Sequence, residues 1–262
     1  MKQVLTIAGS DSGGGAGIQA DLKTMTSFGV YGATVITAVT AQNTLGVQGF
    51  EALSGGFVQM QLDSVCSDLN FSALKTGMLA NSDIIRAVVK KVKEYNLDNL
   101  VVDPVMVATS GDLLLAKEAN EALKEELIPL AKVITPNLNE AKFLLGKGMD
   151  EEVSLEKLAE DLYKLGSEYI LVKGGHGDGQ VARDILYDGE DFIEFKTQRI
   201  DTKDTHGTGC TLSAAIASNL ALGYSVEDSV ARSKEFITKA IKEGCKVGRG
   251  NNPVNHFVKV GN

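Results

Sequence analysis

Cys210 stands at the end of a glycine-containing segment that could hold a phosphate group. The segment Asp204–Cys210 reads DTHGTGC and runs directly into an alanine-rich stretch that begins at Thr211. If a helix starts here, Gly207 to Cys210 place consecutive free N–H groups at its N-terminus, where they can stabilise charge on a phosphoryl group during transfer. A thiol at the same helix end is expected to have a lowered pKa, so Cys210 could act as a base or polariser. The alternative is that Cys210 is a small buried apolar side chain.

A second glycine-rich segment lies between the first predicted strand and the first predicted helix. Gly9–Gly17 holds five glycines in nine residues. In a parallel sheet this position lies at the carboxyl edge, where ligands bind, and glycine lets backbone N–H groups come close to an anion or a ring. The alternative is a flexible turn without a binding role.

The glycine-rich segment near the N-terminus does not match either of two familiar nucleotide loops. The dinucleotide fingerprint G-x-G-x-x-G needs glycine at position 18, after Gly13 and Gly15, and Ile18 stands there. The acidic residue expected about 20 residues further on is missing too. A Walker A loop needs lysine after Gly14, where the chain has Gly15. These mismatches argue against a nicotinamide oxidoreductase and against a P-loop NTPase.

Short apolar runs alternate with longer segments of helical periodicity along most of the chain. The runs predict strands at Val4–Ala8, Ala33–Val39, Ala73–Lys75, Leu100–Val102, Val133–Ile134 and Ile170–Val172. The periodic segments predict helices at Ile18–Phe28, Val58–Leu69, Asp83–Tyr95, Lys117–Leu127, Leu138–Leu145 and Leu155–Leu165. This alternation predicts an α/β fold with a mostly parallel central sheet and helices on both faces.

The C-terminal third departs from this alternation. Val181–Tyr187 and Asp191–Phe195 flank Asp188-Gly189, a turn signal that predicts an antiparallel hairpin near residues 181–195 as an extension of the sheet. Helices are predicted at Thr211–Leu222 and Val226–Glu243. No Pro/Gly/Ser-rich linker, repeat or low-complexity block interrupts the chain, so residues 1–262 are predicted to form a single domain.

Composition narrows the class of protein. A hydrophobic content of 44%, a charged content of 23% and a net charge of −8 are typical of a globular domain that binds neither nucleic acid nor a membrane surface. If a phosphate ligand binds, local backbone dipoles or a metal must oppose this negative field. Cys66, Cys210 and Cys245 form no CxxC pair, and the N-terminus carries no signal-like apolar run, so the sequence predicts a cytoplasmic protein.

Several motifs together resemble the ribokinase-like superfamily of small-molecule kinases. Asp204–Gly209 matches Asp-Thr-x-Gly-x-Gly, and most members then have aspartate where this chain has Cys210. A cysteine at this position resembles the pattern of the hydroxymethylpyrimidine kinases and of one group of bacterial pyridoxal kinases. The hydroxymethylpyrimidine kinases also phosphorylate the monophosphate of their substrate. Further matching motifs, in the family's order, are Leu5–Asp11, Ala16–Thr24, Ala41–Thr44, Lys75–Leu79, Asp103–Met106, Thr135–Ala141 and Lys173–His176. The resemblance implies a ribokinase-like three-layer fold and an ATP-dependent kinase of thiamin biosynthesis.

The resemblance also implies a pyrimidine pocket and its residues. Gln42 and Asp21 offer the donors and acceptors that an aminopyrimidine needs, although each has a plainer reading as a solvated amide or a helix charge. The implied substrate-binding residues are Gly9, Ala16, Asp21, Gln42 and Met78.

The phosphate side of the implied site uses residues from four further motifs. Asp103 resembles the family's partner of the cysteine, and Lys173 can reach the ATP phosphates. Asn137 and Thr208 are implied nucleotide ligands, and Glu140 is the implied ligand of Mg²⁺, which accompanies ATP. A monovalent cation is a further cofactor that the family allows. The plainer readings are a turn aspartate for Asp103, a surface charge for Lys173 and helix capping for Asn137 and Glu140.

The mechanism implied for these residues is direct phosphoryl transfer. Gly207 and Gly209 supply the N–H groups of the anion site, and Cys210 faces the substrate hydroxyl as thiolate and polariser. In the second reaction, which phosphorylates the monophosphate, the Asp11–Gly17 loop is expected to hold the first phosphate. Relatives suggest a homodimer.

Three other functions agree less well with the sequence. A pyridoxal kinase uses the same chemistry on a different ring, but Ala41–Thr44 resembles the pyrimidine branch more closely. A nicotinamide dehydrogenase lacks its fingerprint here. A vitamin-binding module without catalysis would have no use for the phosphate-side residues. His176 and His206 lack metal-ligand spacing, which argues against zinc.

Overall fold

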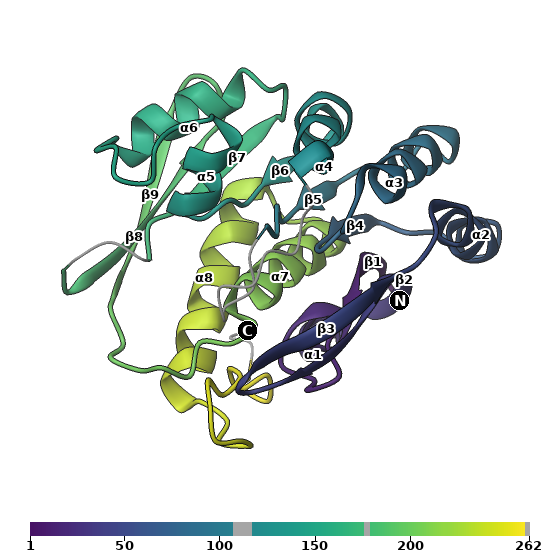
Figure 1. The fold of residues 1–262 in the computed structure, drawn as a ribbon. Coiled ribbons are helices and arrows are strands. Elements are labelled where there is room, and N and C mark those ends of the chain that lie inside the picture. The colour runs from purple at the N-terminus through teal and green to yellow at the C-terminus, as the bar shows by residue number, and fades with distance from the viewer. Residues whose placement is uncertain (107–116, 176–178, 260–262) are drawn as a thin grey trace.

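The computed structural model describes residues 1–106, 117–175 and 179–259, and these residues fold around one sheet (Figure 1). Within them the strand order is β3-β2-β1-β4-β5-β6-β7-β8-β9. The strands are β1 (Gln3–Ser10), β2 (Tyr31–Asn43), β3 (Gly46–Ala52), β4 (Ala73–Thr76), β5 (Leu100–Val102), β6 (Val133–Ile134), β7 (Tyr169–Lys173), β8 (Val181–Tyr187) and β9 (Phe192–Gln198). Neighbours from β2 to β7 pair in parallel, whereas β3, β8 and β9 pair antiparallel with their neighbours.

The predicted α/β architecture and the predicted hairpin are confirmed. The hairpin is β8–β9, and it extends the sheet beyond β7. Strand β3 was not predicted. Its sequence, GVQGFEA, contains two glycines and most of its residues are exposed, so it lacks the apolar pattern of a buried strand. It forms because the chain turns back after β2 ends at Asn43 and pairs antiparallel with β2 at the edge of the sheet.

Helices cover both faces of the sheet (Figure 1). One layer contains α2 (Gly55–Cys66), α3 (Ser82–Glu94), α4 (Lys117–Ala122), α5 (Leu138–Leu144) and α6 (Leu155–Tyr163). The other layer contains α1 (Gly17–Ser27), α7 (Thr208–Leu222) and α8 (Val226–Glu243). The helix predicted at 117–127 is divided, because a π-helical turn at Leu123–Leu127 follows α4.

Two apolar cores, one on each face of the sheet, follow from the alternation of side chains along the strands. In β5, Leu100 and Val102 face the α2–α6 layer, whereas Val101 faces α7. All three side chains are at most 1% exposed. Strands buried on both faces read as continuous apolar runs, which is why these short strands could be predicted from sequence.

Helix α7 lies at the centre of its layer. Every residue from Thr211 to Ala221 is buried, because the helix packs against the sheet, α1 and α8. A helix covered on all sides needs small apolar residues rather than one apolar stripe. This burial fixes the helix, and with it the position of its N-terminus, rigidly against the carboxyl ends of the strands. Among the helices of the described ranges, none has the length and apolar character needed to cross a bilayer.

Candidate active site

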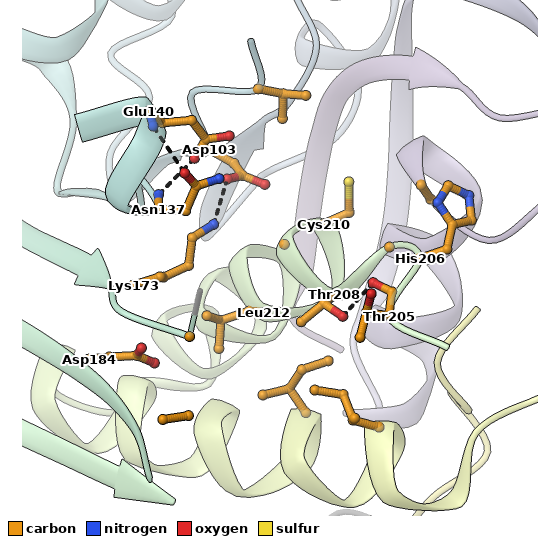
Figure 2. A pocket seen from close by; sticks show the side chains of 18 of the residues that line it. Asp103, Asn137, Glu140, Lys173, Asp184, Thr205, His206, Thr208, Cys210 and Leu212 are labelled. Atoms are coloured by element: carbon orange, nitrogen blue, oxygen red, sulfur yellow. Dashed lines mark hydrogen bonds and ion pairs between the residues drawn. The ribbon is translucent and has the colours of Figure 1, made fainter. Parts of the chain in front are cut away.

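A cavity of about 1170 Å³ opens at the carboxyl ends of the central strands. This exceeds the roughly 300–1,000 Å³ of a typical single-ligand pocket, so the cavity has room for two ligands side by side. The sequence-predicted site residues other than Asp21 all line it, namely Gly9, Ala16, Gln42, Met78, Asp103, Asn137, Glu140, Lys173, Gly207, Thr208, Gly209 and Cys210. Figure 2 shows Asp103, Asn137, Glu140 and Lys173 gathered on one side, with Cys210 between them and His206.

The N-terminus of α7 forms the centre of the cavity. Gly207 caps the helix with φ +80°, a left-handed conformation that glycine adopts easily. The N–H and hydroxyl groups of Thr208 both donate to the Thr205 carbonyl, at 3.2 and 2.6 Å. Within the described residues, the N–H groups of Gly209 and Cys210 have no acceptor, as expected for the first turn of a helix. Two N–H groups therefore remain free to bind an anion.

The Cys210 thiol is affected by the start of a second helix as well, because the Gly17 backbone at the N-terminus of α1 acts to lower its pKa. The prediction of a lowered thiol pKa is nevertheless wrong. Burial raises the pKa of Cys210 to about 11, and the Lys75 ammonium only partly opposes this effect. Desolvation of a thiolate outweighs the helix dipole here. Cys210 is therefore a thiol at neutral pH, and its thiolate is a minor species.

Asp103 and Lys173 form a buried ion pair at the ends of β5 and β7. Lys173 Nζ lies 3.4 Å from Asp103 Oδ1, and the Asp103 side chain is 2% exposed. Ser213 of α7 donates to the other carboxylate oxygen at 3.2 Å, so the carboxylate is held against the helix that carries Cys210. Burial opposes the charge on Lys173, but Asp103 and Glu140 outweigh it and raise the pKa of Lys173. The lysine remains a cation inside the cavity.

Glu140 combines a structural and a potential ligand-binding role. Its Oε2 accepts from the Asn137 N–H at 2.7 Å, and the Asn137 side chain accepts from the Glu140 N–H, which completes a capping box at the start of α5. The plainer reading of this pair is thus present in the structure. The other carboxylate oxygen has no hydrogen bond within the described residues. Burial raises the pKa of Glu140 to about 7, against the opposing charge of Lys173.

The backbone of the glycine-rich loop after β1 binds the carboxylate of Asp11, a residue of the loop itself. The Asp11 carboxylate accepts hydrogen bonds from the N–H groups of Gly13, Gly15 and Ala16 at 2.8–2.9 Å. A substrate phosphate held by this loop would have to displace the Asp11 carboxylate from these N–H groups, so the structure does not support that expectation. Burial opposes ionisation, but the hydrogen bonds from His206 and the backbone lower the pKa of Asp11.

His206 connects this loop to the anion site and to Gln42. Its Nε2 lies 2.9 Å from Asp11 Oδ2 and 3.4 Å from the Gln42 side-chain nitrogen. The Gln42 backbone is fixed separately, since its N–H donates to Ser12 Oγ and its carbonyl accepts from the same hydroxyl, both at 2.8 Å. Gln42 is thus held at the cavity wall opposite the Asp103 cluster. His176 lies outside the described residues.

Asp21 is not at the cavity surface, and the prediction that it lines the pocket is corrected. Its fully buried carboxylate lies 2.8 and 3.0 Å from Lys75 Nζ and accepts from Thr6 Oγ1 at 2.6 Å. Thr6 and Lys75 are direct neighbours on β1 and β4, and both face α1, which carries Asp21. Lys75, not Asp21, is the member of this group that borders the cavity.

Sequence reasoning also missed other residues around the cavity. Lys75 could have been noticed as a charge inside an apolar strand. Asp184 and Lys234 form an ion pair at the cavity wall, and the Gly174 N–H donates to Asp184 at 3.0 Å. Apolar side chains from α7 and α8 line the same end, and no motif marks them: Leu212, Ile237 and Ile241.

The chain is similar to a known family and to known proteins over nearly its whole length. Residues 11–255 match the family described as phosphomethylpyrimidine kinase. The chain is 49% identical to a hydroxymethylpyrimidine/phosphomethylpyrimidine kinase of Rhizobium meliloti over 97% of this chain and 96% of that protein. It is also 49% identical to a thiamine biosynthesis bifunctional protein of Geobacter sulfurreducens, but there it spans only 52% of the relative's length.

The fold is similar to a solved kinase structure. The ADP complex of a pyridoxal kinase from Bacillus subtilis aligns with a TM-score of 0.91 and 42% identity, covering 98% of this chain and 97% of that one. The similarity extends over nearly the whole chain, including the strand ends and helix N-terminus that form the cavity.

Proposed function

Because the chain belongs to the phosphomethylpyrimidine kinase family, we propose that it uses ATP to phosphorylate 4-amino-5-hydroxymethyl-2-methylpyrimidine and then its monophosphate in thiamin biosynthesis. The observation that carries this proposal is one continuous cavity in which a helix N-terminus with free N–H groups lies between His206, the neighbour of Gln42, and the Asp103–Lys173–Glu140 cluster. Phosphoryl transfer needs positioning and charge neutralisation, and this arrangement offers both.

The pyrimidine ring is assigned to the end of the cavity lined by Gly9, Gln42 and Met78. A Cβ atom on Gly9 would lie 3.2 Å from the Met78 sulfur, so glycine keeps a narrow gap open beside it. A flat, neutral ring suits such a gap, and the Gln42 amide supplies both a donor and an acceptor for the aminopyrimidine edge. Ala16 borders the same end.

ATP is assigned to the opposite end. Leu212, Ile237 and Ile241 offer an apolar surface for the adenine, while Asn137, Lys173 and Thr208 border the path toward the α7 N-terminus. The free N–H groups of Gly209 and Cys210 would then hold the transferring phosphoryl group.

Mg²⁺ would be held by the carboxylates of Glu140 and Asp103 together with the ATP phosphates. The described residues contain no group of three His, Cys, Asp or Glu side chains that could hold a metal alone. One or two carboxylates plus phosphate oxygens is the usual donor set for this ion, so the residues fit it. When bound, Mg²⁺ supplies positive charge that offsets the phosphate oxygens.

We expect Glu140→Gln to raise the Mg²⁺ requirement and to weaken MgATP use while pyrimidine binding stays intact. With a pKa of about 7, Glu140 loses its charge as the pH falls through that value. The parent enzyme should therefore need more Mg²⁺ below neutral pH, and Glu140→Gln should lack this pH dependence. Activity titrated against Mg²⁺ on either side of neutrality, with calorimetry for pyrimidine binding, measures both effects. Lost pyrimidine binding with unaltered MgATP affinity would contradict the assignment.

The transfer itself would proceed in line from ATP to the hydroxymethyl oxygen beside Cys210. The oxygen–phosphorus bond to the substrate forms as the bond between the γ-phosphate and ADP breaks. The hydroxyl proton leaves late in a loose transition state and passes to the minor thiolate form of Cys210. Lys173 and the α7 N–H groups stay directed at the phosphoryl oxygens throughout.

The second transfer differs in its acceptor. A phosphate monoester is largely ionised at neutral pH, so its oxygen attacks without first losing a proton. This step requires the anion site and Lys173 but no base.

The substrate assignment has a direct test in Gln42. ATP consumption should give a higher kcat/KM with the hydroxymethylpyrimidine than with pyridoxal, and Gln42→Met should reduce this preference by about 1–3 kcal/mol. Gln59→Met, on α2 and outside the cavity, provides a matched control that should keep the preference. A parent enzyme that favours pyridoxal by about tenfold or more would overturn the assignment.

Pyridoxal kinase remains the second candidate function. The observation in its favour is the likeness to the pyridoxal kinase structure from Bacillus subtilis. The same competition assay separates the two functions.

Further properties are proposed with the function. We place the enzyme in the cytoplasm, since its three cysteines are all free. The whole chain would act as one kinase domain and assemble as a homodimer, which its mass in solution tests. The exposed edge strand β3 and the exposed Phe57 and Met60 of α2 support an interface on that side.

A further inference from the structure

Lys234 and Asp184 form an ion pair at the wall of the cavity, and the proposed transfer does not use it. Lys234 lies on α8 and Asp184 on β8, and their side chains are only 13% and 4% exposed. Replacing such a pair with apolar residues is often neutral or stabilising, so the pair is weak evidence for a role in stability. Its place beside the residues assigned to ATP indicates a different role.

Asp184 lies directly opposite Lys173 on the neighbouring strand. The two residues are Cα partners in the antiparallel β7–β8 pair, so their side chains project from the same face of the sheet. The Cβ atoms of residues paired in this way lie about 4.5–5.5 Å apart, a gap that a lysine side chain easily spans. Asp184 is therefore within reach of the Lys173 ammonium group, yet Figure 2 shows Lys173 turned toward Asp103.

The Lys173 ammonium group lies at the start of α7. A Cβ atom on Gly209 would lie 3.5 Å from Lys173 Nζ and 3.5 Å from Asp103 Oδ2, so the cation stands beside the free N–H groups of the helix. Its ion pair with Asp103 is long, at 3.4 Å, and its side chain is 14% exposed. The ammonium group can therefore turn to the phosphate oxygens when ATP binds.

Both carboxylate oxygens of Asp184 already have partners. Oδ1 accepts from the Gly174 N–H at 3.0 Å, and Oδ2 is paired with Lys234 Nζ. Lys234 thus supplies the compensating charge that a buried carboxylate needs. Without Lys234, this carboxylate would attract Lys173 from the next strand and draw it away from the start of α7.

We propose that Lys234 is a positioning residue that keeps Lys173 free to bind the ATP phosphates by pairing with Asp184. This inference rests on the proposed function, which assigns Lys173 to those phosphates. Lys234 acts through Asp184 and Lys173 and does not itself bind ATP. Asp184 is a competitor for Lys173 that the ion pair neutralises.

The test measures the Kd of MgATP by calorimetry, without an acceptor, together with the melting temperature of each variant. Lys234→Met should raise this Kd by about 10- to 100-fold, since a hydrogen bond to a charged group contributes about that factor. Lys173→Met should raise it as much, and adding Lys234→Met to it should cause no further loss. Lys234→Met/Asp184→Asn should bind MgATP nearly as well as the parent, because the neutral amide does not compete for Lys173.

Asp184→Asn alone breaks the same ion pair and provides the sharpest comparison. Its amide oxygen can still accept from the Gly174 N–H, and no carboxylate remains to attract Lys173. The melting temperature should therefore fall about as far as in Lys234→Met, whereas MgATP binding should stay close to that of the parent. A pair with only a structural role predicts no difference in MgATP binding between the two variants.

Two further variants control for folding. Lys91→Met removes another nearly buried lysine, which pairs with Asp63 and Glu94 outside the cavity, and it should leave the Kd of MgATP unchanged. If Lys234→Met folds poorly, Lys234→Gln takes its place. The glutamine amide can still donate to Asp184 but does not compensate its charge, so MgATP binding should weaken in the same direction.

The possible results separate this inference from the proposed function. Unchanged MgATP binding in Lys234→Met or Lys234→Gln would overturn the role of Lys234. Weakened binding that Asp184→Asn does not restore would also overturn it and would show that Lys234 binds ATP directly. Weakened binding that is restored in the double variant would support it. Failure of the parent to phosphorylate the pyrimidine would instead refute the proposed function, because MgATP binding needs no acceptor.

Discussion

Cys210→Ala should slow phosphorylation of the hydroxymethylpyrimidine by about 10²–10⁴-fold and phosphorylation of the monophosphate far less. The range is that of a positioned general base, and only the first acceptor must lose a proton during transfer. The variant removes one sulfur atom at the surface of the cavity, so folding and ATP binding should be retained. Single-turnover assays with each acceptor, run at saturating MgATP, measure the two rates separately.

The pH dependence sharpens this prediction. The thiol pKa of Cys210 is about 11, so its thiolate fraction should grow steadily as the pH rises from neutrality toward that value. The rate of the first phosphorylation should rise with it and that of the second should not. Cys210→Asp, which installs an ionised carboxylate, should recover part of the lost rate and should reach its plateau at lower pH.

A structural cysteine would give the opposite order of variants. Alanine is then a mild truncation, whereas an aspartate placed in a largely buried position is destabilising. Melting temperatures measured beside turnover distinguish the two cases. Near-normal turnover of the first acceptor in Cys210→Ala would remove Cys210 from the reaction, and an equal loss on both acceptors would assign it to the anion site instead of to proton removal.

Gly207→Ala should reduce both phosphorylations by about 10²–10³-fold, the usual effect of losing part of an oxyanion site. A Cβ atom on Gly207 would lie 1.9 Å from the Gly15 carbonyl oxygen, and the residue has φ +80°. The first turn of α7 must therefore move away from the glycine-rich loop, which displaces the N–H groups of Gly209 and Cys210. Strain of this kind costs about 1–3 kcal/mol of stability.

Gly223→Ala is the matched control at the other end of the same helix. Gly223 also has a left-handed backbone, with φ +96°, but a Cβ atom there would meet nothing within 4 Å. This variant should lose a comparable amount of stability through backbone strain alone and should keep its turnover. Denaturation curves and turnover for both variants separate strain from displacement. Parent-like activity of Gly207→Ala would show that the α7 N-terminus does not act on the phosphoryl group.

Much of the fold was predictable because the central strands are buried on both faces. Leu100–Val102 and Val133–Ile134 were predicted with their observed bounds, since continuous apolar runs leave little ambiguity. Val181–Tyr187 was also predicted with its observed bounds, but from the Asp188-Gly189 turn signal that follows it. β3 was not predicted, because an exposed edge strand needs no apolar pattern and owes its conformation to pairing with β2. Periodicity in the sequence indicates which residues are buried, so it does not predict a strand whose residues are mostly exposed.

The site shows a different limit. Spacing and motifs identified residues that do border one cavity, but they could not show how deeply each side chain is buried. Asp21 and Lys75 both belong to matched motifs, and only the packing of α1 on the sheet decides which of them faces the cavity. The error over the Cys210 pKa has the same origin. A helix N-terminus can be read from sequence, whereas the loss of hydration that outweighs it depends on every element around the thiol.

The carboxylate of Asp11 has a consequence for the thermodynamics of ligand entry. A loop with five glycines has high conformational entropy when it is free, and many such loops become ordered only when a ligand arrives. Here the ordering is completed during folding, because an internal anion already accepts the N–H groups of Gly13, Gly15 and Ala16. The binding free energy of a neutral ring is therefore not reduced by the entropy cost of ordering the loop. Phosphorylated metabolites, abundant in any cell, meet N–H groups there that already donate to Asp11, whereas the start of α7 offers N–H groups that are free.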